Sequence, residues 1–201
     1  MRRVEKRELT TPDLVLLSLL AERAMHGYQA NAELERREVR DWAGISRPQV
    51  YYSLEKLVRL GLVRAAKSAE RVAGPERSVF ATTPRGRRAF AKALEREEWT
   101  SVRERPPFVT WLILSWQVPP RIFRRQVRRR REYLERELAR EEATLKGVID
   151  EVGHRFHEAV WSITLMISMF RTELQWLAKL SREFKRRAPA RRPQYAAPEM
   201  K

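Results

Sequence analysis

The sequence contains no cysteine among its 201 residues. Disulfide bonds, thiolate metal sites and cysteine nucleophiles are therefore excluded. The longest apolar stretch, around 109–116, is far shorter than the ~20 residues that a membrane-spanning helix needs. The N-terminal residues MRRVEKRE are charged and have no hydrophobic segment behind them. We therefore expect no secretory signal, no membrane partner and a cytoplasmic protein.

The motifs of common catalytic sites are also missing. There is no glycine-rich phosphate loop, and no serine lies within a nucleophile motif. His154 and His157 are close in sequence, but no third ligand lies at a useful spacing for a metal ion. We expect no enzyme, no cofactor and no metal site, and we interpret the two histidines as surface or interface residues.

Positive charge, by contrast, is abundant. There are 42 Lys plus Arg against 26 Asp plus Glu, which gives a formal net charge of +16. Such an excess favours a polyanionic partner, with nucleic acid ahead of an anionic membrane surface. The length is enough for one large domain or for two small domains with real cores.

The stretch 45–63 has the features of a short, well-delimited helix. Ser46 is a candidate N-cap, Pro48 falls in the first turn, and Gln49 completes a Ser-x-x-Gln capping box. Gly61 gives the chain a place to leave the helix before an extended segment begins.

The two sides of this helix differ in character. Val50, Leu54 and Leu57 recur at helical spacing on an apolar side. The opposite side carries Gln49, Tyr52, Lys56 and Arg59, with Tyr51 on the flank. Lys56 and Arg59 suit contacts with phosphates, and Gln49 suits a base edge. Taken alone, a polar outer face is more often simply solvated.

The neighbouring segments predict a winged helix. Thr11 is expected to cap a first helix, with Pro12 at its first position and Asp13 near its positive end. The further expected elements are a second helix over 28–37, a connector over 41–44, two strands over 62–72 and 77–82 around the turn 73–76, and a fourth helix from Arg85 to about Trp99. A basic ribbon beside a capped helix is typical of a winged helix-turn-helix.

Several of these positions also form a family pattern. They are Gly27-Tyr28, Ile45-Ser46, the core Tyr51, Leu54, Leu57, Gly61, Leu62 and Val63, and the wing end Phe80, Thr82 or Thr83, and Gly86. The sequence thereby resembles the PadR-like transcriptional regulators over most of residues 10–90. It departs from them at Tyr52, where many relatives carry proline, and at Phe80, which is one place off the usual spacing.

Together, the helix face, the basic wing and the resemblance predict a set of DNA-binding residues. They are Ser46, Arg47, Gln49, Tyr51, Tyr52, Lys56, Arg59, Lys67, Arg71 and Arg77. The resemblance further implies a repressor, and a flat aromatic, phenolic or cationic effector near the junction with the second domain. Trp99, Trp111 and Trp116 are candidates for that pocket, although tryptophans more often fill cores and interfaces.

The C-terminal half is expected to form a separate helical domain. Arg105-Pro106-Pro107 marks the boundary, and helices are expected over 108–117, 122–152 and 154–184. We therefore predict a mainly α protein with a winged helix-turn-helix domain over 1–99, a dimerisation domain of long antiparallel helices over 105–185, and a disordered basic tail over 186–201.

The last helix carries two apolar stripes. One is predicted as the dimer interface and consists of Phe156, Val160, Ile163, Ile167, Phe170, Leu174 and Leu177. The second consists of Trp161, Leu165, Met169, Trp176 and Leu180. The protein's own long helix would cover one side and a partner subunit the other. The arrangement resembles the dimerisation helices of the larger, virulence-activator-like PadR subgroup, with Trp176-Leu177 as their late Trp-Leu pair.

The long helix begins with a run of arginines. They are Arg121, Arg124, Arg125 and Arg128 through Arg131. They are either a solvated helix face or a contact with the phosphates of flanking DNA.

We expect a homodimeric, sequence-specific regulator that binds double-stranded DNA at a palindromic operator, as part of the nucleoid. One alternative is an architectural protein that binds DNA without choosing sequence. Another is an interaction protein that docks a second regulator through its C-terminal arms. Only specific readout would penalise a mismatched base pair, by ~1–3 kcal/mol.

Overall fold

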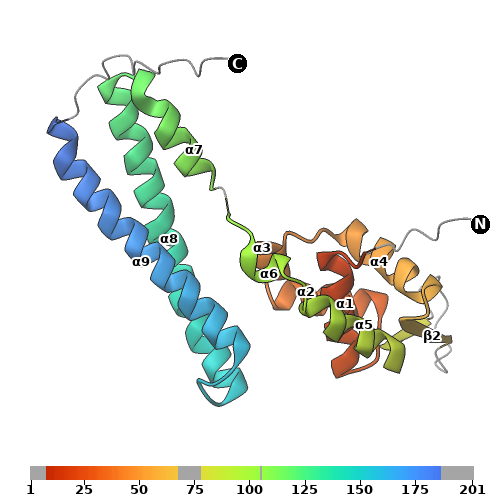
Figure 1. Cartoon of the computed structure of the whole chain (residues 1–201). Coiled ribbons are helices and arrows are strands. Elements are labelled where there is room, and N and C mark those ends of the chain that lie inside the picture. The colour runs from red at the N-terminus through yellow and green to blue at the C-terminus, as the bar shows by residue number, and fades with distance from the viewer. Residues whose placement is uncertain (1–7, 68–77, 105, 187–201) are drawn as a thin grey trace, which may run out of the picture. The chain divides into compact units, whose positions relative to one another are not determined.

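The computed structural model describes residues 8–67, 78–104 and 106–186, and the chain divides into two compact units. Unit 1 is Met1–Arg103 and unit 2 is Glu104–Lys201. The elements of unit 1 are α1 (Thr11–Glu22), β1 (Met25–His26), α2 (Gly27–Arg36), α3 (Val39–Ala43), α4 (Arg47–Arg59), β2 (Val63–Lys67), β3 (Ser78–Thr82), α5 (Pro84–Leu94) and α6 (Glu98–Ser101) (Figure 1). Those of unit 2 are α7 (Pro107–Leu114), a 3-10 turn (Ser115–Gln117), α8 (Pro120–Val152), α9 (Glu158–Glu183) and a second 3-10 turn (Phe184–Arg186).

The core of unit 1 is built from leucine-rich helix faces. α1 contributes the buried Leu16, Leu17 and Leu20, and α4 packs on α1 through Leu54 and Leu57. The predicted apolar side of α4 is therefore confirmed. The first helix begins one residue earlier than expected, because Thr10 and not Thr11 occupies the N-cap position.

A small antiparallel sheet lies beside these helices in the order β1-β3-β2. β2 and β3 form the predicted hairpin, with Val63 opposite Thr82 and Lys67 opposite Ser78. The predicted turn at 73–76 lies outside the described residues. β1 was not predicted, since two residues are too few to carry a strand pattern. It pairs with β3 through Met25 and Phe80.

Two glycines have demanding positions next to α4. Gly61 adopts φ 68°, and the following backbone N–H, from Leu62, donates to the carbonyl of Leu57 at 2.9 Å. This left-handed helix ending confirms the predicted exit from α4. Gly86 lies so close to β2 that a Cβ there would be 2.1 Å from the carbonyl oxygen of Leu62. Any side chain at position 86 would separate α5 from the start of the wing.

Two helices differ from the sequence-based expectation. The connector before Ser46 contains the short helix α3, which ends at Gly44 with φ 63°. The fourth helix ends at Leu94 rather than Trp99, and Trp99 lies in the separate short helix α6.

Unit 2 is organised around α8 and α9, which run side by side in opposite directions (Figure 1). Phe123, Val127 and Leu134 of α8 are buried with Leu177 of α9. A two-pronged ion pair joins Arg130 to Glu173 at 2.7 and 2.8 Å. The predicted mainly α fold, with a winged helix-turn-helix followed by long helices, is confirmed.

Candidate nucleic-acid interface

The N-terminus of α4 is closed by the predicted pair of side chains. Oε1 of Gln49 accepts hydrogen bonds from the backbone N–H and the hydroxyl of Ser46, both at 2.8 Å. The amide oxygen of Gln49 is thus engaged within the protein. Its amide NH2 group carries the hydrogen-bonding capacity that remains for a base.

The outer face of α4 presents aromatic and basic side chains to solvent. Gln49 and Arg59 are exposed, and Tyr51 and Tyr52 are 40% and 60% exposed. Because Val50 and Leu54 are buried on the opposite side, α4 presents this face to solvent without exposing its apolar side. Its dimensions suit the major groove, which admits one α-helix.

Lys56 is not part of this outer face, and the prediction that it contacts phosphate is wrong. Its side chain is buried, and Nζ lies 2.5 Å from Oδ2 of Asp13 on α1. Nζ also donates to the carbonyl oxygen of Glu8 at 3.3 Å. The ammonium group therefore stabilises the packing of α4 on α1 and is not available to DNA.

Arg47, at the start of α4, is held by an acidic side chain. Its guanidinium donates to Glu35 of α2 at 2.7 and 3.0 Å, and Arg40 also reaches Glu35, at 2.9 Å. The hydrogen bond from Arg47 is the main reason why the pKa of Glu35 lies below its usual value. A phosphate would have to compete with Glu35 for this guanidinium.

Tyr28 adds an exposed aromatic ring that was not among the predicted binding residues. It follows Gly27, the first residue of α2, and stacks on His26 with 5.5 Å between the ring centroids. Gly27 is buried so close to the recognition helix that a Cβ there would lie 3.4 Å from the ring of Tyr51. Its early position in α2 is the signal that could have identified Tyr28, because helix N-termini favour phosphate.

The wing is described only at its base. Lys67 ends β2, whereas Arg71 and Arg77 lie outside the described residues. Arg64 on β2 is exposed and was not predicted.

Comparison with known proteins gives a family for this combination of capped helix, hairpin and sheet. Residues 16–92 match the model of the transcriptional regulator PadR-like family. The chain belongs to the PadR-like family of transcriptional regulators. Members of this family are regulators and not enzymes.

Solved structures share the fold of this PadR-like chain across both units. Bacillus subtilis PadR, in complex with operator DNA, has a TM-score of 0.73 at 12% identity, covering 88% of this chain and 98% of that one. A PadR-like regulator from Bacillus cereus has a TM-score of 0.66 at 18% identity, with 88% and 99% covered. The smu.1604c protein of Streptococcus mutans has a TM-score of 0.63 at 16% identity, with 87% and 99% covered. No curated protein sequence matches the chain.

The candidate effector tryptophans have different surroundings. Nε1 of Trp99 in unit 1 donates to the carbonyl of Ala93 at 2.8 Å, and the guanidinium of Arg96 lies 5.3 Å from the ring. Trp111 in unit 2 stacks on Phe108 and packs against Phe123 at 5.4 Å. Trp116 is exposed.

The stripe predicted as the dimer interface of this PadR-like chain is largely covered by the chain itself. Val160, Ile167 and Leu177 are buried, and Phe170 and Leu174 pack against the core shared with α8. The interface prediction is wrong for these residues because their surface is already used within one chain. Ile163 is half-buried, and Phe156 at the helix start is 83% exposed.

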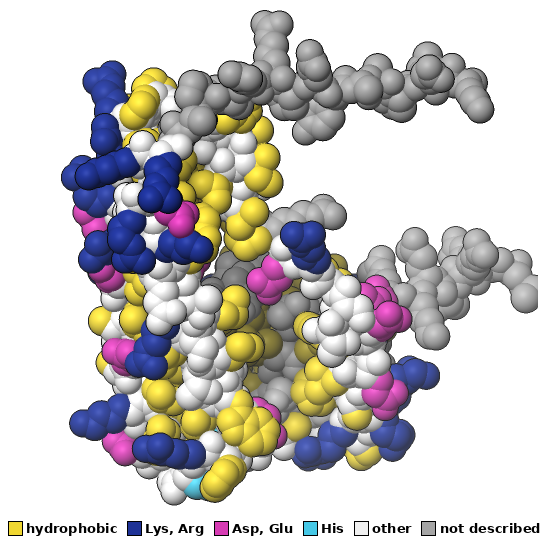
Figure 2. All heavy atoms as spheres, turned by 60° about the vertical axis from the view of Figure 1, so that its left-hand side comes forward, with side chains coloured by type: hydrophobic (Ala, Val, Ile, Leu, Met, Phe, Trp, Pro, Cys, Tyr) yellow, Lys and Arg dark blue, Asp and Glu magenta, His cyan; other side chains and the backbone are white. Residues whose placement is uncertain are grey.

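The second stripe of α9 is the exposed one. Trp161, Leu165, Met169 and Trp176 are 54%, 61%, 47% and 41% exposed. Figure 2 shows hydrophobic side chains at the surface of this helical unit. Among the described residues, none of the helices combines the length and the apolar character needed to cross a membrane.

His154 and His157 act at the start of α9. Nδ1 of His157 accepts a hydrogen bond from the backbone N–H of Ala159 at 3.1 Å, and Nδ1 of His154 accepts one from Phe156 at 3.2 Å. Both imidazoles therefore cap backbone groups. In the part of the chain that the structure describes, no group of three His, Asp or Glu side chains could hold a metal ion.

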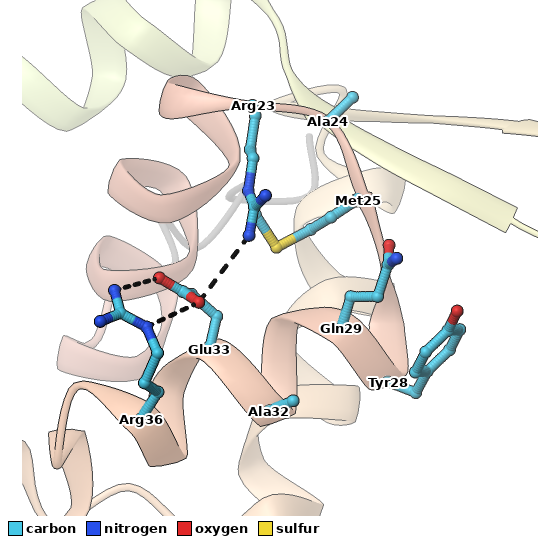
Figure 3. A pocket seen from close by; sticks show the side chains of 8 residues that line it. All are labelled: Arg23, Ala24, Met25, Tyr28, Gln29, Ala32, Glu33 and Arg36. Carbon is cyan, nitrogen blue, oxygen red and sulfur yellow. Dashed lines mark hydrogen bonds and ion pairs between the residues drawn. The ribbon is translucent and has the colours of Figure 1, made fainter.

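A surface pocket of about 360 Å³ lies between the end of α1 and α2. Its lining residues are Arg23, Ala24, Met25, Tyr28, Gln29, Ala32, Glu33 and Arg36. Figure 3 shows Arg23 and Arg36 converging on Glu33, at 3.8 and 2.8 Å. Hydrogen bonds from Arg36, and then from Arg37, lower the pKa of Glu33 to about 2. The charges of the pocket are thus largely used to connect α1 with α2.

This lowered pKa predicts how the stability of unit 1 depends on pH. Ionised Glu33 stabilises the folded state fully above its ordinary pKa of 4.5, and this contribution is lost as pH falls towards 2. Glu33→Gln should flatten the pH dependence of the unfolding free energy in that window by up to about one proton. Urea titrations between these two pH values would measure it. Glu38→Gln, at an exposed position, is the control, and equal slopes for both variants would contradict the assignment.

Proposed function

We propose that this PadR-like chain is a sequence-specific DNA-binding regulator, and that its exposed α4 face enters the major groove. The observation that carries the proposal is the capped helix with Gln49, Tyr52 and Arg59 exposed on one side and a buried aliphatic side behind it. The net charge of +16 supports a nucleic-acid partner. The operator-bound structure of Bacillus subtilis PadR supports it by analogy of fold.

Footprinting of the intergenic DNA upstream of the gene, followed by single base-pair substitutions, tests the sequence specificity. A specific regulator should lose ~1–3 kcal/mol for each mismatched pair in the site. An architectural protein would bind all variants equally. An interaction protein that docks another regulator would bind none of them tightly.

The capping role of Gln49 sharpens the proposal for base contacts. A bidentate contact with adenine needs both the oxygen and the NH2 of the amide. In this cap the oxygen is occupied by Ser46, so Gln49 would offer only its N–H donors. Acceptors on the major-groove edge, such as guanine N7 and O6, are the matching partners.

We expect Gln49→Glu to separate helix capping from base contact. Glutamate is a good capping-box partner for Ser46, but it has no N–H donor at neutral pH. The variant should keep the stability of unit 1 and lose ~1–3 kcal/mol of discrimination at one base pair. Arg59→Ala should instead weaken binding to all duplexes and reduce the salt slope by about one counterion. Fluorescence anisotropy over a salt series would measure both.

Arg155→Ala, at an exposed position in unit 2, is the matched control for charge. Unchanged affinity and unchanged discrimination in both α4 variants would contradict the groove assignment. A Gln49→Glu variant that loses stability would contradict the capping argument. Contacts from Ser46, Arg47, Tyr51 and Tyr52 belong to the same proposal.

Phosphate contacts by the wing, through Lys67, Arg71 and Arg77, remain a prediction from the sequence. They would add affinity with little sequence preference, since phosphate contacts position a protein rather than specify a site. Location in the cytoplasm, with the nucleoid, also remains a prediction.

We propose further that the regulator is a homodimer and a repressor. The exposed stripe of α9, and the exposed Ile113 and Leu114 of α7, support a second copy of this chain as the partner. A two-fold dimer would present two α4 helices ~34 Å apart to a palindromic operator.

A small aromatic or phenolic effector is the last part of the proposal. It is supported by the complex of Bacillus subtilis PadR with p-coumaric acid. Trp116 offers an exposed ring for stacking, whereas the rings of Trp99 and Trp111 already have partners.

A further inference from the structure

The first three turns of α8 carry a concentration of arginine that the winged helix does not explain. Residues 120–131, PRIFRRQVRRRR, contain seven arginines and no acidic residue. Figure 2 shows Lys and Arg side chains gathered over the end of the helical unit where α8 begins.

Some of these arginines serve the fold. Arg130 forms the two-pronged pair with Glu173, which raises the pKa of Arg130 and joins α8 to α9. Arg131 pairs with Glu135 at 2.7 Å. These two side chains have a sufficient structural role.

The others have little to hold them. Arg128 reaches Glu132 only at 3.8 Å. Among the described residues, no carboxylate pairs with the remaining arginines, which are Arg121, Arg124, Arg125 and Arg129. Arg124 lies over the ring of Phe184 at 5.4 Å, and Arg129 is 3.5 Å from Gln126. All five of these guanidinium-bearing residues are exposed.

Four of them form one ridge. At 3.6 residues per turn, positions 121, 125, 128 and 129 fall within about 100° of the helix circumference and span about 12 Å along its axis. Phe123 and Val127, which are buried against α9, lie on the opposite side. The ridge therefore points away from the core of unit 2.

This arrangement is unfavourable for an isolated helix. Cations at the N-terminal, positive end oppose the helix dipole, and no acidic residue occupies the first turn of α8. Like charges four residues apart, such as Arg121 with Arg125, also repel each other. An external anion would remove both costs. Arginine, used here without any lysine, is suited to bidentate contacts with phosphate.

We propose that Arg121, Arg124, Arg125, Arg128 and Arg129 form a second DNA-binding surface, which binds the phosphate backbone of duplex DNA without choosing sequence. The choice of DNA as the polyanion rests on the proposed function of the chain. An anionic membrane is the weaker candidate, because a membrane-surface helix inserts its apolar face and that of α8 is buried against α9.

The test is a fourfold Arg→Gln variant at positions 121, 125, 128 and 129 of the full chain. Glutamine and arginine have similar helix propensity, so α8 should persist. On a duplex of scrambled sequence, the slope of log affinity against log salt should fall by roughly three, at ~0.9 per phosphate contact. Affinity at low salt should fall roughly tenfold or more.

The matched control replaces Lys146, Arg155, Lys179 and Arg182, all exposed in unit 2, by glutamine. It removes the same four charges from a net charge of +16. Equal losses in the two variants would overturn the proposal, because they would reflect overall charge alone. A fourfold Arg→Lys variant at the ridge should keep the salt slope, and it remains informative if the Gln variant does not fold. A loss of slope in the folded Lys variant would also overturn the proposal.

Vesicles of phosphatidylserine and phosphatidylcholine provide the membrane arm. A ridge variant that loses vesicle binding but keeps DNA binding would overturn the proposal in favour of a membrane. The proposed sequence-specific function can fail separately. A wild type that binds all duplexes equally, and a ridge variant that binds them more weakly than the control, would disprove specific regulation and support the ridge.

Discussion

Replacing Lys56 by alanine is expected to lower the unfolding free energy of unit 1 by ~3–5 kcal/mol, because it would leave a buried carboxylate without its counter-charge. Asp13 is 0% exposed and Lys56 is 6% exposed. Oδ2 of Asp13 also accepts from the backbone N–H and the hydroxyl of Thr10, at 2.8 and 2.9 Å. Oδ1 has no hydrogen-bond partner among the described residues. The ammonium group of Lys56 is thus the main compensation for the buried charge.

A double replacement distinguishes this ion pair from simple packing. Asp13→Asn keeps an oxygen that can accept from Thr10, and Lys56→Met fills the space of the lysine stem without a charge. The double variant should recover most of the loss seen in Lys56→Ala, because removing both charges leaves neither unpaired.

Urea denaturation followed by circular dichroism would give the unfolding free energies, and DNA titrations over a salt series would give the counterion slope. The loss of stability should come without a change of slope in the fraction that remains folded. A Lys56→Ala variant of normal stability with a slope reduced by about one would return Lys56 to the DNA-facing side.

The different outcomes along α4 have a physical explanation. The cap at Ser46 and the exit at Gly61 were predictable because they depend on residues a few positions apart. Lys56 was placed on the wrong side because its partner, Asp13, is 43 positions away. At 3.6 residues per turn, Lys56 lies at the edge of the polar side, and only the packing of α1 decides its environment.

The two stripes of α9 illustrate the same limit. Their periodicity showed that both needed covering, but two apolar stripes of similar composition do not reveal which one faces α8. Charged partners settle the choice: Arg130 with Glu173, and Arg171 with Glu142 at 2.6 Å, fix the rotation of α9 on α8. A search for complementary charges between the two helices could have detected it. The contacts of Gly27 with Tyr51 are also long-range, which is why Tyr28 was overlooked.

The second large effect concerns the subunit interface. Leu165→Glu combined with Met169→Lys is expected to convert the dimer into a folded monomer, because charges introduced mid-stripe would be buried at the seam at a cost of several kcal/mol. Within the chain both positions are exposed, at 61% and 47%. The helicity of unit 2 should therefore be retained. Sedimentation should give the mass of one chain, and the remaining DNA binding should be salt-sensitive and non-specific.

Two further variants make the result decisive. Ala139→Glu with Ala143→Lys introduces the same charges on the exposed side of α8 and should leave the dimer intact. Phe170→Glu with Leu174→Lys changes the stripe that packs on α8, so it should destabilise unit 2 itself rather than yield a folded monomer. A folded monomer from this last pair would return the interface to the inner stripe. A wild type that is already monomeric at micromolar concentration would contradict the dimer, and a single α4 could not then read a two-fold operator.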